Sequence, residues 1–122
     1  MIDKKKTLVI GASPDRSRYS FLVTSLLISM GHEVVAFGKR IGDINSIPIK
    51  QKFPVGEEFD TVTLYLNPTH QQEYYEDILA LKLQRVIFNP GTENDEFYEL
   101  LNKANINYEE ACTLVLLKTG RY

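Results

Sequence analysis

The sequence is poor in the residue types that most often build metal sites and disulfides. Its 122 residues include one cysteine, two histidines and no tryptophan. The single cysteine, Cys112, has no partner for an internal disulfide, so nothing indicates an oxidising compartment. His32 and His70 lie far from Cys112 and from each other in the sequence, which argues against a dedicated metal site. We therefore expect neither a disulfide framework nor a bound metal.

The sequence also lacks an excess of charge of one sign and lacks long apolar runs. Fourteen Lys and Arg residues stand against sixteen Asp and Glu residues, for a formal net charge of −2. Nucleic acids and anionic membranes require a concentrated basic surface, so neither is an expected partner. No apolar run could span a bilayer, and residues 1–6 lack the apolar stretch of a signal peptide. These absences predict a cytoplasmic protein.

The composition that is present predicts one globular domain over residues 1–122. Hydrophobic residues make up 43% of the chain and charged residues 25%, which is typical of a folded domain. A chain of this length can bury one hydrophobic core but not two substantial ones. A homodimer is plausible for so small a domain, although no pattern in the sequence indicates one directly.

Short apolar, β-branched runs alternate with segments of helical spacing. The expected strands are residues 7–10, 32–37, 49–53, 61–66, 85–88 and 106–108. The expected helices are residues 19–30, 69–83, 95–104 and 111–118. Alternation of strand and helix with short connections predicts an α/β fold of three layers. We expect a Rossmann-like, doubly wound and mainly parallel sheet with helices on both faces.

The turn after the first expected strand is the sharpest functional signal. Gly11 permits a close backbone approach, and free amides with the dipole of the following helix favour a bound phosphate. Ser13 and Ser20 add hydroxyl groups, and Arg16 adds a positive charge. The full Gly-x-Gly-x-x-Gly fingerprint is absent, and a glycine here can also form a simple tight turn. Both interpretations stay open.

The end of the second expected strand discriminates between nucleotides. Proteins that bind NAD usually place an acid there to accept hydrogen bonds from the ribose hydroxyls. This chain has Phe37, Gly38, Lys39 and Arg40 instead. Two cations suit a ribose that carries a phosphate, as in coenzyme A or NADP, although they are also consistent with solvated loop charges.

No catalytic constellation is evident, so we expect a protein that is not an enzyme. Cys112 lies in an apolar run, which predicts a buried packing residue. His70 stands at the expected ligand edge without an acid or nucleophile beside it in the sequence. Tyr74, Tyr75 and Tyr98 have helical spacing among apolar neighbours and are predicted to be core or interface residues.

Several of these segments together resemble the small bacterial CoA-binding domain proteins, which are similar to the N-terminal domain of the succinyl-CoA synthetase alpha subunit. The resemblance covers about residues 5–118. It is carried by residues 8–14, Ser20, residues 31–35, Asp60, Asn67 with Pro68, residues 88–91, and Cys112.

The resemblance implies a Rossmann-like domain that binds coenzyme A without ligase chemistry, because the phosphohistidine of the synthetase belongs to a second domain. It places the phosphates at Gly11, Ala12, Ser13, Arg16 and Ser20, and the nucleotide beside Phe37, Gly38 and Lys39. The opposite wall would be Leu66, Asn67, Pro68, Asn89, Pro90 and Gly91. The chain departs from many relatives at Gly38 and Lys39, where they have Asn-Pro, and at Asn67, where they have Arg.

Three functional hypotheses follow from the sequence. The first is a non-catalytic protein that binds coenzyme A or an acyl-CoA. The second is an NADP-binding protein resembling an oxidoreductase, which the glycine turn and the two cations also allow. The third is a regulatory interaction module that keeps the fold without a ligand.

Overall fold

A seven-stranded sheet forms the centre of the molecule. The computed structural model describes residues 4–122. The strands are β1 (Thr7–Ile10), β2 (Val34–Phe37), β3 (Asp43–Ile44), β4 (Ile47–Lys50), β5 (Glu58–Leu64), β6 (Lys82–Phe88) and β7 (Asn107–Glu110). Their order in the sheet is β3-β4-β2-β1-β5-β6-β7. All neighbours run parallel except β3 and β4, which form an antiparallel pair.

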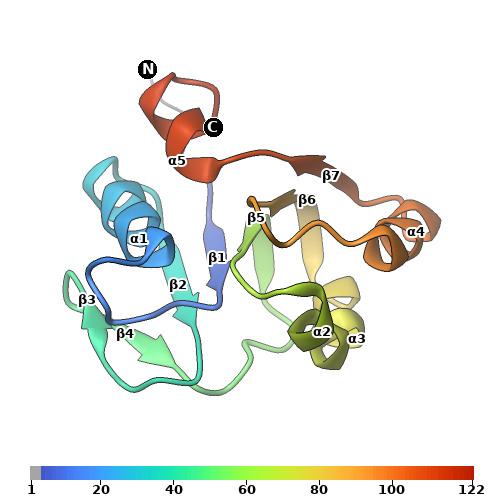
Figure 1. Cartoon of the computed structure of the whole chain (residues 1–122), viewed down its shortest axis with the longest axis horizontal. Helices are drawn as coiled ribbons and strands as arrows, with labels where there is room; N and C mark the ends of the chain where they lie inside the picture. Colours follow the sequence, from blue (N-terminus) through green and yellow to red (C-terminus); the bar gives the residue numbers. More distant parts are fainter. Residues whose placement is uncertain (1–3) are drawn as a thin grey trace.

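Helices cover both faces of this sheet (Figure 1). They are α1 (Tyr19–Ser29), α2 (Pro68–Gln71), the 3-10 turn η1 (Gln72–Tyr74), α3 (Tyr75–Leu79), α4 (Asp95–Lys103) and α5 (Thr113–Lys118). One core cluster contains Val9 with Leu27 of α1 and Leu117 of α5. The other contains Leu8 and Ile10 with buried residues of α3 and α4. The three-layer, Rossmann-like α/β fold predicted from the sequence is confirmed.

The strand β1 lies at the point where the winding reverses. It pairs with β2 on one side and with β5 on the other, so the chain runs outward from β1 in both directions. A doubly wound sheet opens a crevice at the carboxyl ends of its strands at such a point. The loops after β1, β2 and β5 therefore meet at one place.

The structure differs from the sequence prediction in several elements, among them β5, which covers residues 58–64 rather than 61–66. One strand was expected at residues 49–53, but residues 43–50 form the β3–β4 hairpin. The expected helix over residues 69–83 is broken at Tyr74, whose φ of −111° and ψ of 2° leave the helical region. Strand β6 then begins at Lys82, three residues earlier than expected, because Lys82 and Leu83 pair with the start of β5. In the described residues, no helix has the length and apolar character needed to cross a membrane.

Candidate functional site

The turn after β1 is bonded directly to the end of β2. Gly11 has a φ of +90°, and a Cβ at this position would lie 2.9 Å from the backbone carbon of Tyr65. The N–H groups of Gly11 and Ala12 both donate to the carbonyl oxygen of Phe37, each at 2.9 Å. From the sequence, free amides were expected at this turn. These two are occupied, so the amides available to an anion lie further along the loop.

The loop over residues 13–18 is ordered by its own side chains. Ser13 Oγ accepts a hydrogen bond from the N–H of Asp15, and Asp15 Oδ1 accepts from the N–H and the hydroxyl of Ser17. These two bonds from Ser17 lower the pKa of Asp15 below its usual value. Arg18 follows as the N-cap of α1 but provides no side-chain cap. The first amides of α1 therefore remain without a side-chain partner.

The loop after β2 approaches the same turn closely. A Cβ added to Gly38 would lie 2.3 Å from the carbonyl oxygen of Ala12, so only glycine fits there. The ring of Phe37 packs edge-to-face on Phe53 and Tyr74, with ring centroids 5.3 and 5.2 Å apart. The segment at the end of β2 therefore contacts the first turn through Gly38 and two aromatic rings through Phe37.

Three adjoining hollows at this edge of the sheet form one groove. The basic chamber, of about 400 Å³, is lined by Gly11, Ala12, Arg18, Phe37, Gly38, Lys39, Arg40, Leu66, His70, Glu73 and Tyr74. The middle chamber, of about 320 Å³, is lined by Gly11, Ser13, Arg18, Tyr19, Ser20, Arg40 and Tyr65. The terminal chamber, of about 230 Å³, is lined by Tyr19, Tyr65, Asn89, Pro90 and Cys112. Neighbouring chambers share lining residues and therefore adjoin, and we call the three chambers together the groove.

Positive charge is concentrated at one end of the groove. Arg18 and Arg40 line both the basic and the middle chambers, and Lys39 lines the basic chamber. Lys39 Nζ lies 3.8 Å from a carboxylate oxygen of Glu73, and both side chains are largely exposed. An exposed pair of this kind contributes little stability, so Lys39 can exchange Glu73 for a ligand phosphate at small cost.

Ten of the fourteen residues predicted from the sequence line the groove. They are Gly11, Ala12, Ser13, Ser20, Phe37, Gly38, Lys39, Leu66, Asn89 and Pro90. The two turns and the strand ends therefore converge as the fold class requires.

The other four predicted residues have different surroundings. Arg16 is exposed, with its guanidinium 6.0 Å from the ring centroid of Phe21. Asn67 caps α2 by accepting a hydrogen bond from the N–H of His70, and Pro68 is the first residue of that helix. Gly91 forms a turn with a φ of +92°.

Asn89 lines the terminal chamber while its side chain is bonded within the protein. Its Nδ2 donates to Thr63 Oγ1 at 2.7 Å and to the carbonyl of Leu64 at 2.8 Å. Its Oδ1 accepts from the N–H of Thr113 at 2.9 Å. Asn89 is only 2% exposed, so its side chain connects β5, β6 and the start of α5. This arrangement is that of a structural clamp.

Several groove residues were not predicted as site residues from the sequence. They include Tyr19, Tyr65, His70, Glu73, Tyr74 and Cys112, whereas Arg40 was noted from the sequence as one of the two cations after the second strand. Tyr19 begins α1 and Tyr65 directly follows β5, so a position at the end of an element was the signal that could have identified them. Cys112 was expected to be buried, but it is half-buried because it precedes α5 at the groove.

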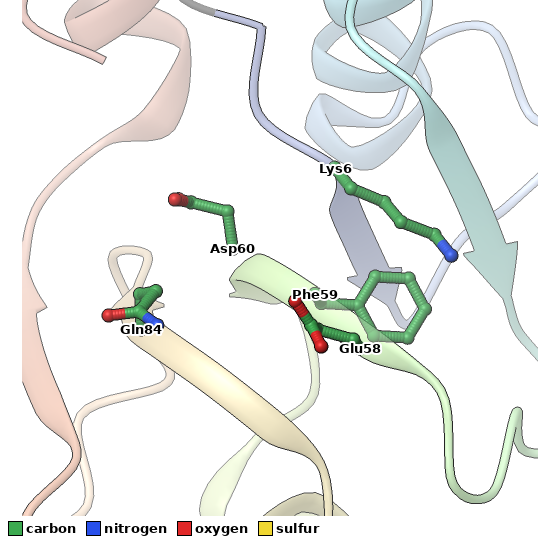
Figure 2. Close-up of a pocket in the computed structure, with 5 residues that line it drawn as sticks. All are labelled: Lys6, Glu58, Phe59, Asp60 and Gln84. Atoms are coloured by element: carbon green, nitrogen blue, oxygen red, sulfur yellow. The ribbon is translucent and has the colours of Figure 1, made fainter.

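A further hollow, of about 670 Å³, lies at the opposite edge of the sheet. It is lined by Lys6, Glu58, Phe59, Asp60 and Gln84 (Figure 2). Lys6 Nζ lies 5.0 Å from the ring centroid of Phe59 and is paired with Glu33 and Glu57, at 3.6 and 3.4 Å. Its charge is thus already balanced by acids. An anionic ligand is better matched by the groove at the carboxyl ends of the strands.

Comparison with known proteins defines the class. Residues 5–118 match the family described as CoA binding domain. A crystal structure of an uncharacterized protein shares 46% identity, covering 98% of this chain and 99% of that one, with a TM-score of 0.95. The chain belongs to the CoA binding domain family. The comparison with curated proteins returns no match.

More distant structures share the fold. A protein from Thermus thermophilus, solved as cell-free ID.343, is 22% identical with a TM-score of 0.82, over 98% of this chain and 91% of that one. A hypothetical protein from Pyrococcus horikoshii OT3 is also 22% identical with a TM-score of 0.82, over 95% and 82% of the two chains. At this level of identity they establish the architecture alone.

Proposed function

We propose that this protein binds coenzyme A in the groove without transforming it. The observation that carries the proposal is the charge of the groove, together with membership of the CoA binding domain family. The basic and middle chambers present Arg18, Lys39 and Arg40 beside the uncapped start of α1. Coenzyme A carries a diphosphate and a 3′-phosphate on its nucleotide half, and these groups match the cations and the helix terminus.

The proposal of a non-catalytic role rests on the side chains that line the groove. A general base needs a partner within hydrogen-bond reach, and a nucleophile needs an activating group beside it. Among the described residues, no hydrogen bond of the His70 side chain is found, and its backbone N–H donates to Asn67 Oδ1. Cys112 lines a chamber without a charged residue. Binding and release of the intact ligand is the function that this set supports.

A thermal-shift panel of coenzyme A, dephospho-coenzyme A, NADP and NAD tests this proposal. A ligand that binds only the folded state at 100 times its Kd adds about 2.7 kcal/mol of stability. Coenzyme A should therefore raise Tm clearly, and NAD should not. The absence of a shift with millimolar coenzyme A would reject the proposal. Protection by NADP alone, with NADPH-linked turnover, would favour the oxidoreductase alternative that Lys39 and Arg40 also allow.

Lys39→Ala locates the nucleotide within the groove. Because Lys39 is exposed and pairs with Glu73, its contact with a 3′-phosphate should contribute at most about 1 kcal/mol. The variant should bind coenzyme A about twofold to fivefold more weakly by calorimetry and leave dephospho-coenzyme A unchanged. Lys103→Ala, at the far end of α4, serves as the control. Equal losses for both ligands would show that Lys39 does not meet the 3′-phosphate.

A further inference from the structure

The groove loses its charge along its length. Arg18, Lys39 and Arg40 line the basic and middle chambers, whereas the five residues of the terminal chamber are two tyrosines, an asparagine, a proline and a cysteine. Coenzyme A has the same asymmetry, since its phosphates lie on the nucleotide half and its pantetheine arm is uncharged. Coenzyme A bound in the groove as proposed would match this asymmetry with its thiol end at the terminal chamber.

The polar side chains of the terminal chamber carry no charge, and that of Asn89 is already hydrogen-bonded within the protein. Both Nδ2 protons of Asn89 bond to Thr63 Oγ1 and the Leu64 carbonyl, so they do not reach a ligand. Burial raises the pKa of Tyr65 above its usual value, so its hydroxyl stays uncharged at neutral pH. A carboxylate placed in this chamber would find no cation among its lining residues.

Apolar side chains continue outward from the chamber along two helices. Leu22 lies one turn along α1 from Tyr19, and Val115 lies one turn along α5 from Cys112. Leu22 is 42% exposed and Val115 is 54% exposed. Both helices pack on the same face of the sheet, through Leu27 of α1 and Leu117 of α5. We call Tyr19, Leu22, Cys112 and Val115 the apolar strip.

We infer that the terminal chamber and the apolar strip hold the uncharged acyl chain of a coenzyme A thioester. The inference rests on the proposed function and adds the class of the ligand to it. Chain length and the charge at the chain end should both affect binding. An aliphatic chain removes apolar surface from water here, whereas a terminal carboxylate would lose hydration without gaining a cation.

The test compares four ligands by calorimetry: coenzyme A, butyryl-CoA, hexanoyl-CoA and succinyl-CoA. A fully buried methylene strengthens binding about fourfold, and a half-open strip should give about twofold for each one. Hexanoyl-CoA should thus bind more tightly than butyryl-CoA, and butyryl-CoA more tightly than coenzyme A. Succinyl-CoA has the same acyl carbon number as butyryl-CoA and should bind no better than coenzyme A.

A comparison of Val115→Asp with Val55→Asp tests whether the acyl chain binds at the apolar strip or at exposed apolar residues in general. Both valines are exposed, but Val55 lies in the loop between β4 and β5. Val115→Asp should abolish the preference for hexanoyl-CoA and leave coenzyme A binding intact, whereas Val55→Asp should change neither. An aspartate in the first turn of α5 is also compatible with the helix dipole, so the variant should fold.

The possible outcomes distinguish the inference from the proposed function. If coenzyme A itself does not bind, the proposed function fails. If all four ligands bind equally, the groove binds coenzyme A but the acyl-chain inference is wrong. Sedimentation of the wild type and of Val115→Asp adds a third outcome. A dimer that this substitution dissociates would mean that a second copy of the chain, rather than an acyl group, covers the strip.

Discussion

Replacing Asn89 with alanine should mainly reduce stability, although Asn89 lies at the groove. The substitution removes the two hydrogen bonds that Nδ2 donates to Thr63 Oγ1 and the Leu64 carbonyl. It also removes the acceptor of the Thr113 N–H at the start of α5. All of these groups are buried, so water cannot replace Asn89 without entering the core.

The expected loss of unfolding free energy is about 4 kcal/mol. Each of the two donated bonds contributes about 1 kcal/mol, and a buried amide left without a partner costs about 1–3 kcal/mol more. Domains are typically stable by about 5–15 kcal/mol, so Asn89→Ala should still fold but with a small margin. For a chain of 122 residues the corresponding fall in Tm is on the order of 10 to 15 °C.

Urea unfolding followed by circular dichroism measures this loss, and calorimetry measures coenzyme A binding to the folded variant. Asn102→Ala is the matched control, because Asn102 is exposed on α4 and alanine is the better helix former. The control should be neutral or slightly stabilising. If Asn89→Ala cost less than about 1 kcal/mol but weakened coenzyme A tenfold, Asn89 would be a ligand-binding residue and the clamp interpretation would be wrong.

Two further predictions concern Gly38 and His32, which lie near the two ends of β2. Gly38→Ala should cost about 2–3 kcal/mol in urea unfolding, because its Cβ would lie 2.3 Å from the Ala12 carbonyl oxygen. Buried His32 should reduce stability as the pH falls. Burial, with Lys4 and Lys5 nearby, lowers its folded-state pKa below the usual 6.5. The unfolded state thus binds the proton more readily, and stability declines from about pH 6.5 down through the lowered pKa.

Each of these predictions has a matched control. Gly56→Ala places a Cβ in open space and should cost only about 1 kcal/mol through its positive φ, so equal losses at Gly38 and Gly56 would contradict the steric argument. His32→Asn keeps an acceptor for the N–H of Lys5 and should flatten the decline between pH 7.5 and 5.5. His70→Asn, at an exposed site, should leave that decline unchanged. If the stability of His32→Asn still declines over this pH range, the decline arises from other groups and the His32 prediction is wrong.

The fold was predictable from the sequence because its central strands are apolar on both faces. Residues 7–10 and 34–37 are almost entirely buried, and such short runs alternating with helical segments are typical of a parallel sheet covered on both faces. The β3–β4 hairpin was not predictable in the same way. Its turn uses Asn45 and Ser46 at positive φ, without a glycine, and Pro48 lies within the strand β4. Such positions read as loop from the sequence.

Site residues were predictable where the backbone conformation requires a particular residue type. They were less predictable where contacts between distant parts of the chain determine the role of a residue. Gly11 was identified because a close backbone approach requires glycine, whereas Gly38 was named through the family resemblance and its close approach to Ala12 is visible only in the structure. Asn89 was placed correctly at the groove, but its hydrogen bonds to residues 24 to 26 positions away are not visible in a linear pattern. Tyr65 was missed because a tyrosine at the end of a strand reads as a core residue.

The bonding between the first two turns restricts how this groove can change. The Phe37 carbonyl accepts from both Gly11 and Ala12, and Gly38 touches the Ala12 carbonyl from the other side. A shift of one backbone segment would displace the other, so we expect the two loops to move as one rigid unit. A change in which ligand the groove prefers would then come from the side chains around the two loops, such as Arg18, Lys39 and those at the start of α5. If the groove binds coenzyme A as proposed, substitutions of these side chains should change the preferred ligand without changing the backbone of the two turns.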